Sequence, residues 1–389
     1  MTIHIQKIAQ NRWAIFFSFL SLFLLGLADN IRGPLFPEII NYFSLSSAKG
    51  SLSFATTSTA AFFGSYLSGH YLKKFSISSL LALSIFIMSA GLVIMGTAIN
   101  FKILIVGSFI FGLSFGFLAV AQNLLVSENS HPKNRSKILS GLHAMYGFAS
   151  FLAPLFAAGV TVYFNGWRAA FLLTACLCFL FVIVQLLFPP NPHFTISKNI
   201  SNTSEQSNAR ISKLAQLMIG GLLGFYVVAE ILVSTRLAQY MRTYFLMDLQ
   251  SSSQYVTYFF LFLLAGRLFF AFNKINSSFR LQMNVSLGLS IIFLILGLNI
   301  HPFFLALVGL SMAPFYPLSI AYISEMTGIH SRVFITFAMS FQSLLVIGMH
   351  LGVGYITDQL GLFYAFGVGI FALVLSSICL NLHPKKLTY

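Results

Sequence analysis

The stretch PPNPHFTISKNISNTSEQSNARISK, residues 189–213, is the long polar segment of a 389-residue chain. Its prolines and its run of Asn, Ser and Thr are typical of a flexible linker. Six apolar segments precede it and six follow it, which divides the chain into residues 1–188, the linker 189–213 and residues 214–389. The sequence therefore predicts two bundles of six helices joined by a cytoplasmic linker.

The composition excludes a soluble globular protein. Hydrophobic residues make up 57% of the chain and charged residues only 8%, whereas soluble domains carry about 25% charged residues. Each apolar segment is long enough for a helix that spans a bilayer, which takes about 20 residues. We therefore expect an all-α integral membrane protein with about twelve transmembrane helices. The apolar segments are residues 13–40, 51–72, 77–99, 103–126, 138–164, 167–188, 214–246, 255–272, 281–299, 303–324, 333–356 and 362–382.

Basic residues are distributed unevenly between the two sides that alternating spans define. Only Lys49, Lys102 and Arg168 fall in loops on the side away from the N-terminus. This bias follows the positive-inside rule and predicts that both ends of the chain lie in the cytoplasm. The net charge of +14 thus indicates topology, and we expect no nucleic-acid partner. The basic residues of the near side are Lys7, Arg12, Lys73, Lys74, Lys133, Arg135, Lys137, Lys198, Arg210, Lys213, Lys274, Arg280, Arg332, Lys385 and Lys386.

The two halves repeat each other at an offset of 197 residues. The matches extend from the second to the fourth segment of each half, which indicates two related six-helix units. The matched residues are Gly69 with Gly266, Gly91 with Gly288, GLS at 112–114 with GLS at 309–311, SE at 127–128 with SE at 324–325, and Arg135 with Arg332.

This layout resembles the major facilitator superfamily, whose members contain two six-helix halves. Short strings also resemble the fucose permease-like branch of proton-coupled sugar symporters: GLADNIRGP at 26–34, QN at 122–123, LH at 142–143, GWR at 166–168 and YVVAE at 226–230. The sequence departs from the motifs of this family at two places that bear on function. The loop after Gly69 lacks the acidic residue of the superfamily signature, and the fourth span offers Gln122 and Asn123 in place of a second carboxylate.

Charged residues inside predicted spans are the main candidates for chemistry, because each costs about 2.5–3.5 kcal/mol at the bilayer centre. Asp29 and Arg32 lie three residues apart, on one helical face. Glu230 and Arg236 lie in the corresponding span of the second half, and the resemblance implies that all four meet in a central cavity. We expect Asp29 and Glu230 to carry protons. The alternatives are a static Asp29–Arg32 pair and a Glu230–Arg236 pair that holds the halves together.

Polar residues in other spans complete the predicted site. Amide, hydroxyl and imidazole groups suit hydrogen bonding to a polyhydroxy or carboxylate solute, and an imidazole also exchanges protons near neutral pH. Arg32 and Arg236 favour an anionic solute, whereas the family resemblance favours a neutral sugar. The predicted substrate-binding residues are Arg32, Gln122, Asn123, His143, Tyr146, Arg236 and Gln342. Charges near the loops are expected to form gating salt bridges, or to be plain surface charges, and these are Glu128, Arg135, Glu325, Arg332, Lys73 and Arg267.

The predicted function is secondary active transport of a small polar solute, such as a sugar, a sugar acid or an organic anion, by proton-coupled symport. Proton-driven efflux of a drug, siderophore or metabolite is the alternative. A membrane sensor or enzyme is the rival from another class. Enzyme signatures and metal-ligand spacings are lacking, so we expect no enzyme, cofactor or metal. The expected partners are a small-molecule substrate, protons and lipid around a monomer in a bacterial inner membrane, since the abundance of Phe, Ile, Asn and Lys is typical of an AT-rich genome.

Overall fold

The computed structural model describes residues 11–131, 134–189, 212–273 and 275–382, except for the side chains of residues 136, 329 and 332. Most of the predicted linker lies outside these ranges. All regular structure within them is helical. The helices are α1 (Arg12–Asn30), α2 (Arg32–Tyr42), α3 (Ser47–Tyr71), α4 (Ile77–Gly96), α5 (Phe101–Asn129), α6 (Arg135–Tyr163), α7 (Arg168–Leu187), α8 (Lys213–Phe245), α9 (Leu249–Phe272), α10 (Phe279–Asn299), α11 (Phe303–Met312), α12 (Phe315–Thr327), the short 3-10 helix η2 (Gly328–His330), α13 (Ser331–Leu360) and α14 (Leu362–Leu382).

Two spans are each built from a pair of helices. Residues 12–42 form one span from α1 and α2, and residues 303–327 form another from α11 and α12. Pro34 and Pro37 follow the first break and Pro314 precedes the restart of the second. Proline has no backbone N–H and clashes with the preceding turn, which interrupts a helix at these points.

Counted over the described residues, eleven spans are apolar enough to cross a membrane by length and composition. The twelfth is α3, whose many Ser, Thr and Gly residues lower its hydropathy. Thr57 and Ser65 of α3 donate to the backbone carbonyls of Ser108 and Gly116 on α5, so α3 turns polar groups toward protein and not toward lipid. The prediction of an all-helical membrane protein with about twelve spans is confirmed.

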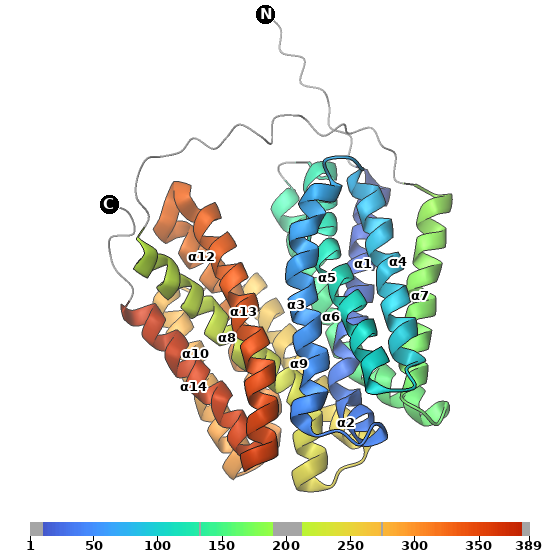
Figure 1. The fold of residues 1–389 in the computed structure, drawn as a ribbon. Coiled ribbons are helices and arrows are strands. Elements are labelled where there is room, and N and C mark those ends of the chain that lie inside the picture. The colour runs from blue at the N-terminus through green and yellow to red at the C-terminus, as the bar shows by residue number, and fades with distance from the viewer. Residues whose placement is uncertain (1–10, 132–133, 190–211, 274, 383–389) are drawn as a thin grey trace, which may run out of the picture.

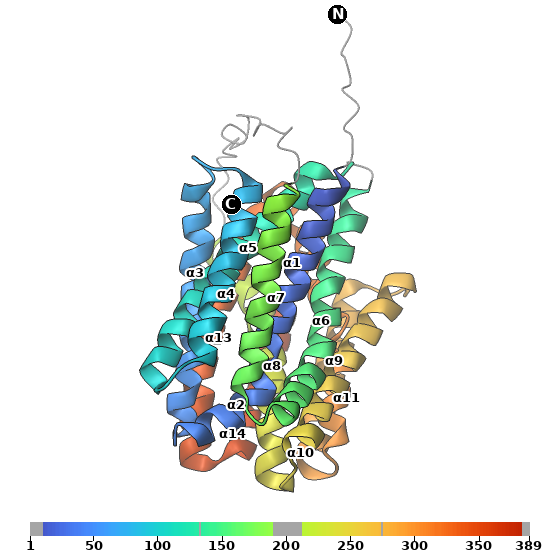
Figure 2. The same ribbon diagram turned by 90° about the vertical axis from the view of Figure 1, so that its right-hand side faces the viewer.

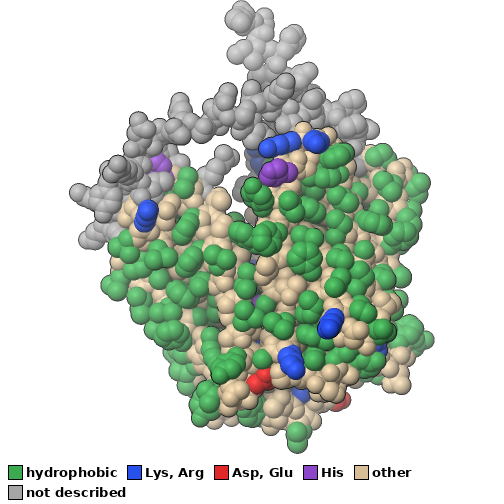
Figure 3. Space-filling view, viewed as in Figure 1, with side chains coloured by type: hydrophobic (Ala, Val, Ile, Leu, Met, Phe, Trp, Pro, Cys, Tyr) green, Lys and Arg blue, Asp and Glu red, His purple; other side chains and the backbone are tan. Residues whose placement is uncertain are grey.

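Buried apolar side chains form separate cores in the two parts of the chain. One core draws its residues from α1 to α7, with Leu249 added, and the other cores draw theirs from α8 to α14. Figure 1 shows the two groups of helices side by side, and Figure 2 shows the long helices running between the same two ends. Apolar side chains cover most of the face in Figure 3, and charged side chains there are few. A surface of this kind suits lipid.

The two halves contact each other along α3 and α13, α6 and α9, and α2 and α8. We name the two ends of the molecule after the first span, as the Arg12 end and the Tyr42 end. In Figure 1 the groups of helices approach each other at the Tyr42 end, drawn at the bottom, and spread apart toward the Arg12 end. At Gly33 of α2, an added Cβ would lie 2.9 Å from the carbonyl oxygen of Ser234 on α8, so only glycine allows this approach.

Candidate substrate and proton site

Asp29, at the end of α1, interacts with residues of two other helices. Its Oδ2 accepts from the hydroxyl of Tyr146 on α6 at 2.8 Å, and its Oδ1 lies 3.4 Å from Nη1 of Arg32 on α2. Arg32 is 3% exposed, and its Nη2 donates to the carbonyl of Ser53 at 3.3 Å. The guanidinium lies 4.5 Å from the ring centre of Phe54, whose face stabilises the cation. The three-residue spacing thus brings the pair together as predicted, although the helix breaks between them.

Glu230 on α8 forms a second ion pair, with a partner that the sequence did not predict. Nη2 of Arg267 on α9 donates to Oε1 of Glu230 at 3.1 Å. Tyr226, one turn earlier on α8, is fully buried and donates to the carbonyl of Met312 at 2.8 Å. The expected alternative pairing of Glu230 with Arg236 is wrong. Residues six apart on a helix point about 240° apart, so these two side chains leave α8 on different sides.

A cavity of about 20 Å³ lies beside Tyr146 and the Glu230–Arg267 pair. Tyr146 and Ser150 of α6 line it from the first half, and Glu230 and Arg267 line it from the second. This volume holds about one water molecule. His143, on the same helix as Tyr146, lies close enough to Arg267 for their charges to interact. The ion pairs and the tyrosine form what we call the central cluster, which consists of Asp29, Arg32, Tyr146, Glu230 and Arg267.

Arg236 forms no ion pair with the central cluster and lies against α3. It is fully buried, and its Nη2 donates to Oγ of Ser51 at 2.6 Å. The ring centre of Phe36 lies 4.2 Å from its guanidinium carbon. No carboxylate within the described residues lies within 4.0 Å of it. Of the four charges that we expected to meet, Asp29, Arg32 and Glu230 gather at the centre, with Arg267 in the place of Arg236.

Three predicted amide residues form no hydrogen bond with the central cluster among the described residues. Asn123 donates to the carbonyl of Ala119 at 2.7 Å, within its own helix. Gln122 is 3% exposed, and its Oε1 has no hydrogen-bond partner among the described residues. Gln342 on α13 packs against Gly224 of α8, and its Oε1 also lacks such a partner. Their place in a substrate site stays a prediction.

The predicted gating residues lie at the Arg12 end, with one exception. Glu128 ends α5, Arg135 begins α6 and Glu325 lies near the end of α12, while Lys73 follows α3. No ion pair joins these four side chains, and the side chain of Arg332 lies outside the described residues. The exception is Arg267, which we correct from a gating residue to a member of the central cluster, because its side chain pairs with Glu230.

The Tyr42 end holds contacts that the sequence analysis missed. Both carboxylate oxygens of Asp358 on α13 accept from α3, from the backbone N–H of Ser47 at 2.8 Å and of Ala48 at 2.9 Å. Arg242 of α8 pairs with Glu38 of α2 across the same boundary. The sequence did contain a signal for these contacts. The chain has only eight acidic residues, so each of them is a candidate for an ion pair or a helix cap.

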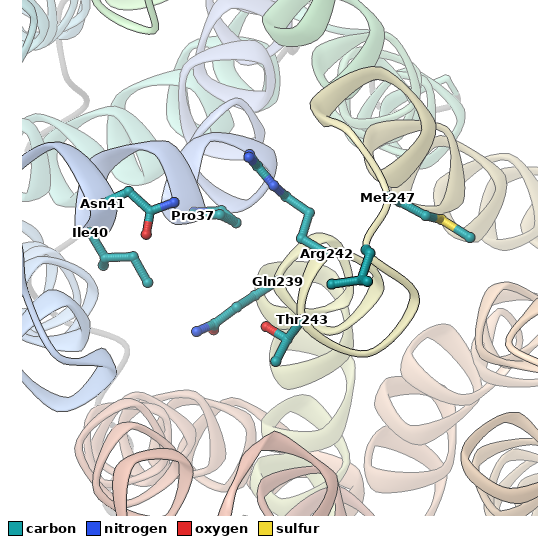
Figure 4. A pocket seen from close by; sticks show the side chains of 8 residues that line it. Pro37, Ile40, Asn41, Gln239, Arg242, Thr243 and Met247 are labelled. Atoms are coloured by element: carbon teal, nitrogen blue, oxygen red, sulfur yellow. The ribbon is translucent and has the colours of Figure 1, made fainter.

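A larger cavity, of about 310 Å³, also lies at the Tyr42 end and not at the central cluster. Its walls come from α2, from the last turns of α8 and from the residues that follow α8. Figure 4 shows these side chains, with those of α8 facing those of α2 across the opening. The lining residues are Pro37, Ile40, Asn41, Gln239, Arg242, Thr243, Leu246 and Met247.

With this geometry established, comparison with known families is informative. The model of the Major Facilitator Superfamily matches residues 18–342. The chain belongs to the Major Facilitator Superfamily. The superfamily predicted from the repeat and the short strings is therefore confirmed.

Curated members of the superfamily share part of this sequence. Myo-inositol transporter 3A of Cryptococcus neoformans var. grubii is 26% identical over 45% of this chain, and a probable metabolite transport protein of Saccharomyces cerevisiae is 28% identical over 44%. The matched regions span 30% and 31% of those proteins, so the chain matches about a third of their length.

Solved superfamily structures share the fold over nearly the whole chain. An inward-facing, occupied bacterial homologue of the human lysosomal transporter Spinster superposes with a TM-score of 0.78 at 11% identity, covering 96% of this chain and 97% of that one. A D-xylose–proton symporter superposes with a TM-score of 0.75 at 14% identity, covering 95% and 97%. At such identities the likeness shows the fold alone.

Proposed function

We propose that this superfamily member is a secondary active transporter that moves a small polar solute across a membrane, with protons as the coupling ion. The observation that carries the proposal is the central cluster, in which two carboxylates and two arginines lie between the halves. Charges at this depth are expensive and are usually retained for ion or substrate pathways. The names of the curated relatives and of the xylose symporter support a sugar-like or metabolite solute.

The arrangement of the two ends supports transport by alternating access. Inter-half hydrogen bonds gather at the Tyr42 end, where α3 meets α13 and α2 meets α8. We infer that residues 1–188 and 214–389 rock as two bodies about the central cluster. In this mechanism the Tyr42 end is closed in the present conformation and the Arg12 end is open.

Proton coupling in this mechanism depends on exchange of partners at Asp29. A proton that binds Asp29 removes the negative charge that Arg32 faces at 3.4 Å and that Tyr146 stabilises at 2.8 Å. Arg32 is then free to bind an oxygen of the solute. Glu230 and Arg267 offer the same exchange from the second half, so protonation and solute binding are linked at a boundary that changes during rocking.

The test is proton flux into proteoliposomes that contain the full chain and a pH-sensitive dye. The panel contains myo-inositol, D-xylose, sugar acids and small organic acids. We expect at least one solute to drive proton entry, and D29N to reduce that flux to the background of empty liposomes. D248N is the matched control, because Asp248 caps α9 outside the spans and Asn caps a helix equally well.

Both results of this assay are decisive for the proposal. Solute-dependent flux that persists in D29N and in E230Q would remove these carboxylates from the coupling mechanism. Absence of flux with every solute, in protein with a normal melting temperature, would contradict symport of this solute class. Proton-driven efflux is then examined in the same vesicles, by loading candidate solutes inside and following their exit under an imposed proton gradient.

The distribution of basic residues between the two ends supports an orientation of the chain in the membrane. Among the described residues, the Arg12 end carries Lys73, Lys74 and Arg135 in its loops and helix starts, whereas the Tyr42 end carries few basic loop residues. By the positive-inside rule, we infer that the Arg12 end faces the cytoplasm and propose a bacterial inner membrane. A reporter fusion after residue 44 and another after residue 75 should therefore report opposite sides.

A further inference from the structure

Arg236 is a buried cation with most of its hydrogen-bonding capacity unused. Nη2 donates to Oγ of Ser51 at 2.6 Å, while Nε and Nη1 have no partner among the described residues. The aromatic rings of Phe36 and Phe54 lie 4.2 and 5.4 Å from the guanidinium carbon. The two unpartnered nitrogens carry three N–H groups that favour an acceptor, and a negative one above all.

No carboxylate neutralises this charge in the described residues. Arg32, Arg242 and Arg267 each form an ion pair between or within the halves, and Arg236 does not. Asp358 is the acid whose charge acts on Arg236, but both of its oxygens accept backbone N–H groups of α3. A buried charge without a counter-charge is costly, and among the described arginines of this interface Arg236 is the one that forms no ion pair.

A buried histidine near this arginine also has a ring nitrogen without a hydrogen-bond partner among the described residues. His350 of α13 is 3% exposed, and its Nδ1 has no hydrogen-bond partner in the described part of the chain. Its ring stacks on Phe54 at 5.1 Å, and it lies near enough to Arg236 and Arg32 for both of their charges to act on it. Two arginines and a histidine, drawn from both halves, thus surround one phenylalanine.

A route from the surface ends one helical turn from Arg236. Gln239 lies three residues after Arg236 on α8, so these two side chains share one face of the helix. Gln239 and Arg242 line the cavity of about 310 Å³ at the Tyr42 end (Figure 4). The start of α3 separates this cavity from Arg236. Gln239 donates to Oγ of Ser47 at 2.8 Å, and Arg236 donates to Oγ of Ser51 one turn further along α3.

We propose that Arg236, assisted by His350, binds the oxyanion group of the transported solute when α3 and α13 separate at the Tyr42 end. This inference rests on the proposed transport function and narrows the solute to one that carries a carboxylate or a phosphate. A neutral polyol would satisfy the N–H groups and leave the charge uncompensated. An oxyanion satisfies both, and solute binding at Arg236 then favours the conformation in which the Tyr42 end is open.

The test measures binding directly, by thermal unfolding of the purified full chain in detergent. The probes are inorganic phosphate, D-glucuronate and D-glucose at equal ionic strength, the last two differing only in the carboxylate. We expect phosphate or glucuronate, and not glucose, to raise the melting temperature in a saturable manner. R236Q should weaken that response at least tenfold, R236K should weaken it less, and R280Q should respond like the wild type, because Arg280 binds Asn381 at the surface.

The folding of the variant is not an obstacle. Removal of an uncompensated buried charge should leave the melting temperature of ligand-free R236Q equal to that of the wild type or above it. An R236Q response equal to that of the wild type overturns the inference, and so does a wild-type response to none of the oxyanions.

Comparison with the flux assay separates this inference from the proposed function. Proton flux driven by D-glucose or myo-inositol and retained in R236Q would leave transport established and the anion site refuted. Anion binding that is lost in R236Q, without flux for any solute, would establish the anion site and contradict the proposed symport.

Discussion

Tyr146 decides how firmly the Asp29 carboxylate is held. Its hydroxyl donates to Oδ2 at 2.8 Å, and the same side chain lines the small cavity beside the Glu230–Arg267 pair. A hydrogen bond to a charged group stabilises that charged state by roughly 1.5–3 kcal/mol. Tyr146 therefore holds the Asp29 carboxylate in place beside Arg32.

Replacement of Tyr146 by phenylalanine should slow transport without abolishing it. We expect Y146F to reduce solute-driven proton flux about tenfold, the rate equivalent of roughly 1.4 kcal/mol. The measurement is the initial rate of dye acidification in proteoliposomes. Y355F is the matched control, since Tyr355 is 63% exposed. A Y146F rate within twofold of the wild type would show that the hydroxyl has no part in proton release.

Contacts between single residues were predicted from the sequence only where both partners lie close together in one apolar span. Asp29 and Arg32 lie three apart, so their contact follows from helix geometry. Glu230 finds Arg267 on another helix, and that choice depends on how α8 and α9 are rotated about their axes. Helix rotation is a property of packing between elements, which spacing along one segment does not contain.

Among the elements, α3 seals the Tyr42 end. Its first turn offers unpaired N–H groups, as every helix start does, and Asp358 from the other half accepts two of them. The positive end of the α3 dipole thus meets a carboxylate of α13. Further along α3, Ser51 binds Arg236, so successive turns of one helix contact the opposite half.

Replacement of Asp358 by alanine should open the Tyr42 end. Loss of a helix cap costs about 1 kcal/mol, which shifts the ratio of closed to open molecules about fivefold. The measurement is the labelling rate of a cysteine at Ala55, one turn after Ser51, by a membrane-impermeant maleimide. Cys176, Cys178 and Cys379 are first replaced.

D248A is the control for this experiment, because Asp248 caps α9 within a single half by accepting from Ser251 at 2.7 Å. Faster labelling in D358A and unchanged labelling in D248A are expected. Equal rates in D358A and the wild type would mean that the Asp358 contact does not hold the halves together.

Hydropathy predicts where the helices lie along the chain, but it predicts their first residues less accurately. The span predicted from residue 51 begins at Ser47, and the span predicted from residue 255 begins at Leu249. Both helices open with polar residues behind a capping side chain, Ser46 in α3 and Asp248 in α9. A capping residue marks a helix start that apolarity does not detect.

At the scale of the whole molecule, two cores meet along a boundary that includes polar contacts between the halves. Gly354 of α13 faces the start of α3 so closely that an added Cβ would lie 2.9 Å from the Cα of Ala48. Contacts this close across the boundary must break if the halves rock. A covalent link there should therefore stop transport.

The double variant A48C/G354C places two thiols at this contact, and α3 and α13 have to shift apart slightly to admit the new side chain of residue 354. We expect oxidation to abolish solute-driven flux and a reductant to restore it. The control is S290C/S311C, whose hydroxyls lie 2.8 Å apart inside one half; this link should leave flux unchanged. Full flux in the oxidised A48C/G354C protein would exclude separation of the halves at this point.

The architecture was the most predictable level, because it depends on summed properties. Twelve apolar segments, a charge bias and an internal repeat lead to the superfamily without knowledge of any contact. The site was less predictable, since Gln122, Asn123 and Gln342 are polar residues inside spans and nothing in their spacing distinguishes a solute ligand from a packing contact.

The low hydropathy of α3 has a consequence for biosynthesis. Its Ser, Thr and Gly residues suit contacts with α5 and α13, and both of those helices leave the ribosome after α3 does. A segment this polar partitions weakly into lipid by itself. We therefore expect α3 to be retained at the translocon until α5 emerges, so that the helix which seals the finished protein is inserted together with its neighbours.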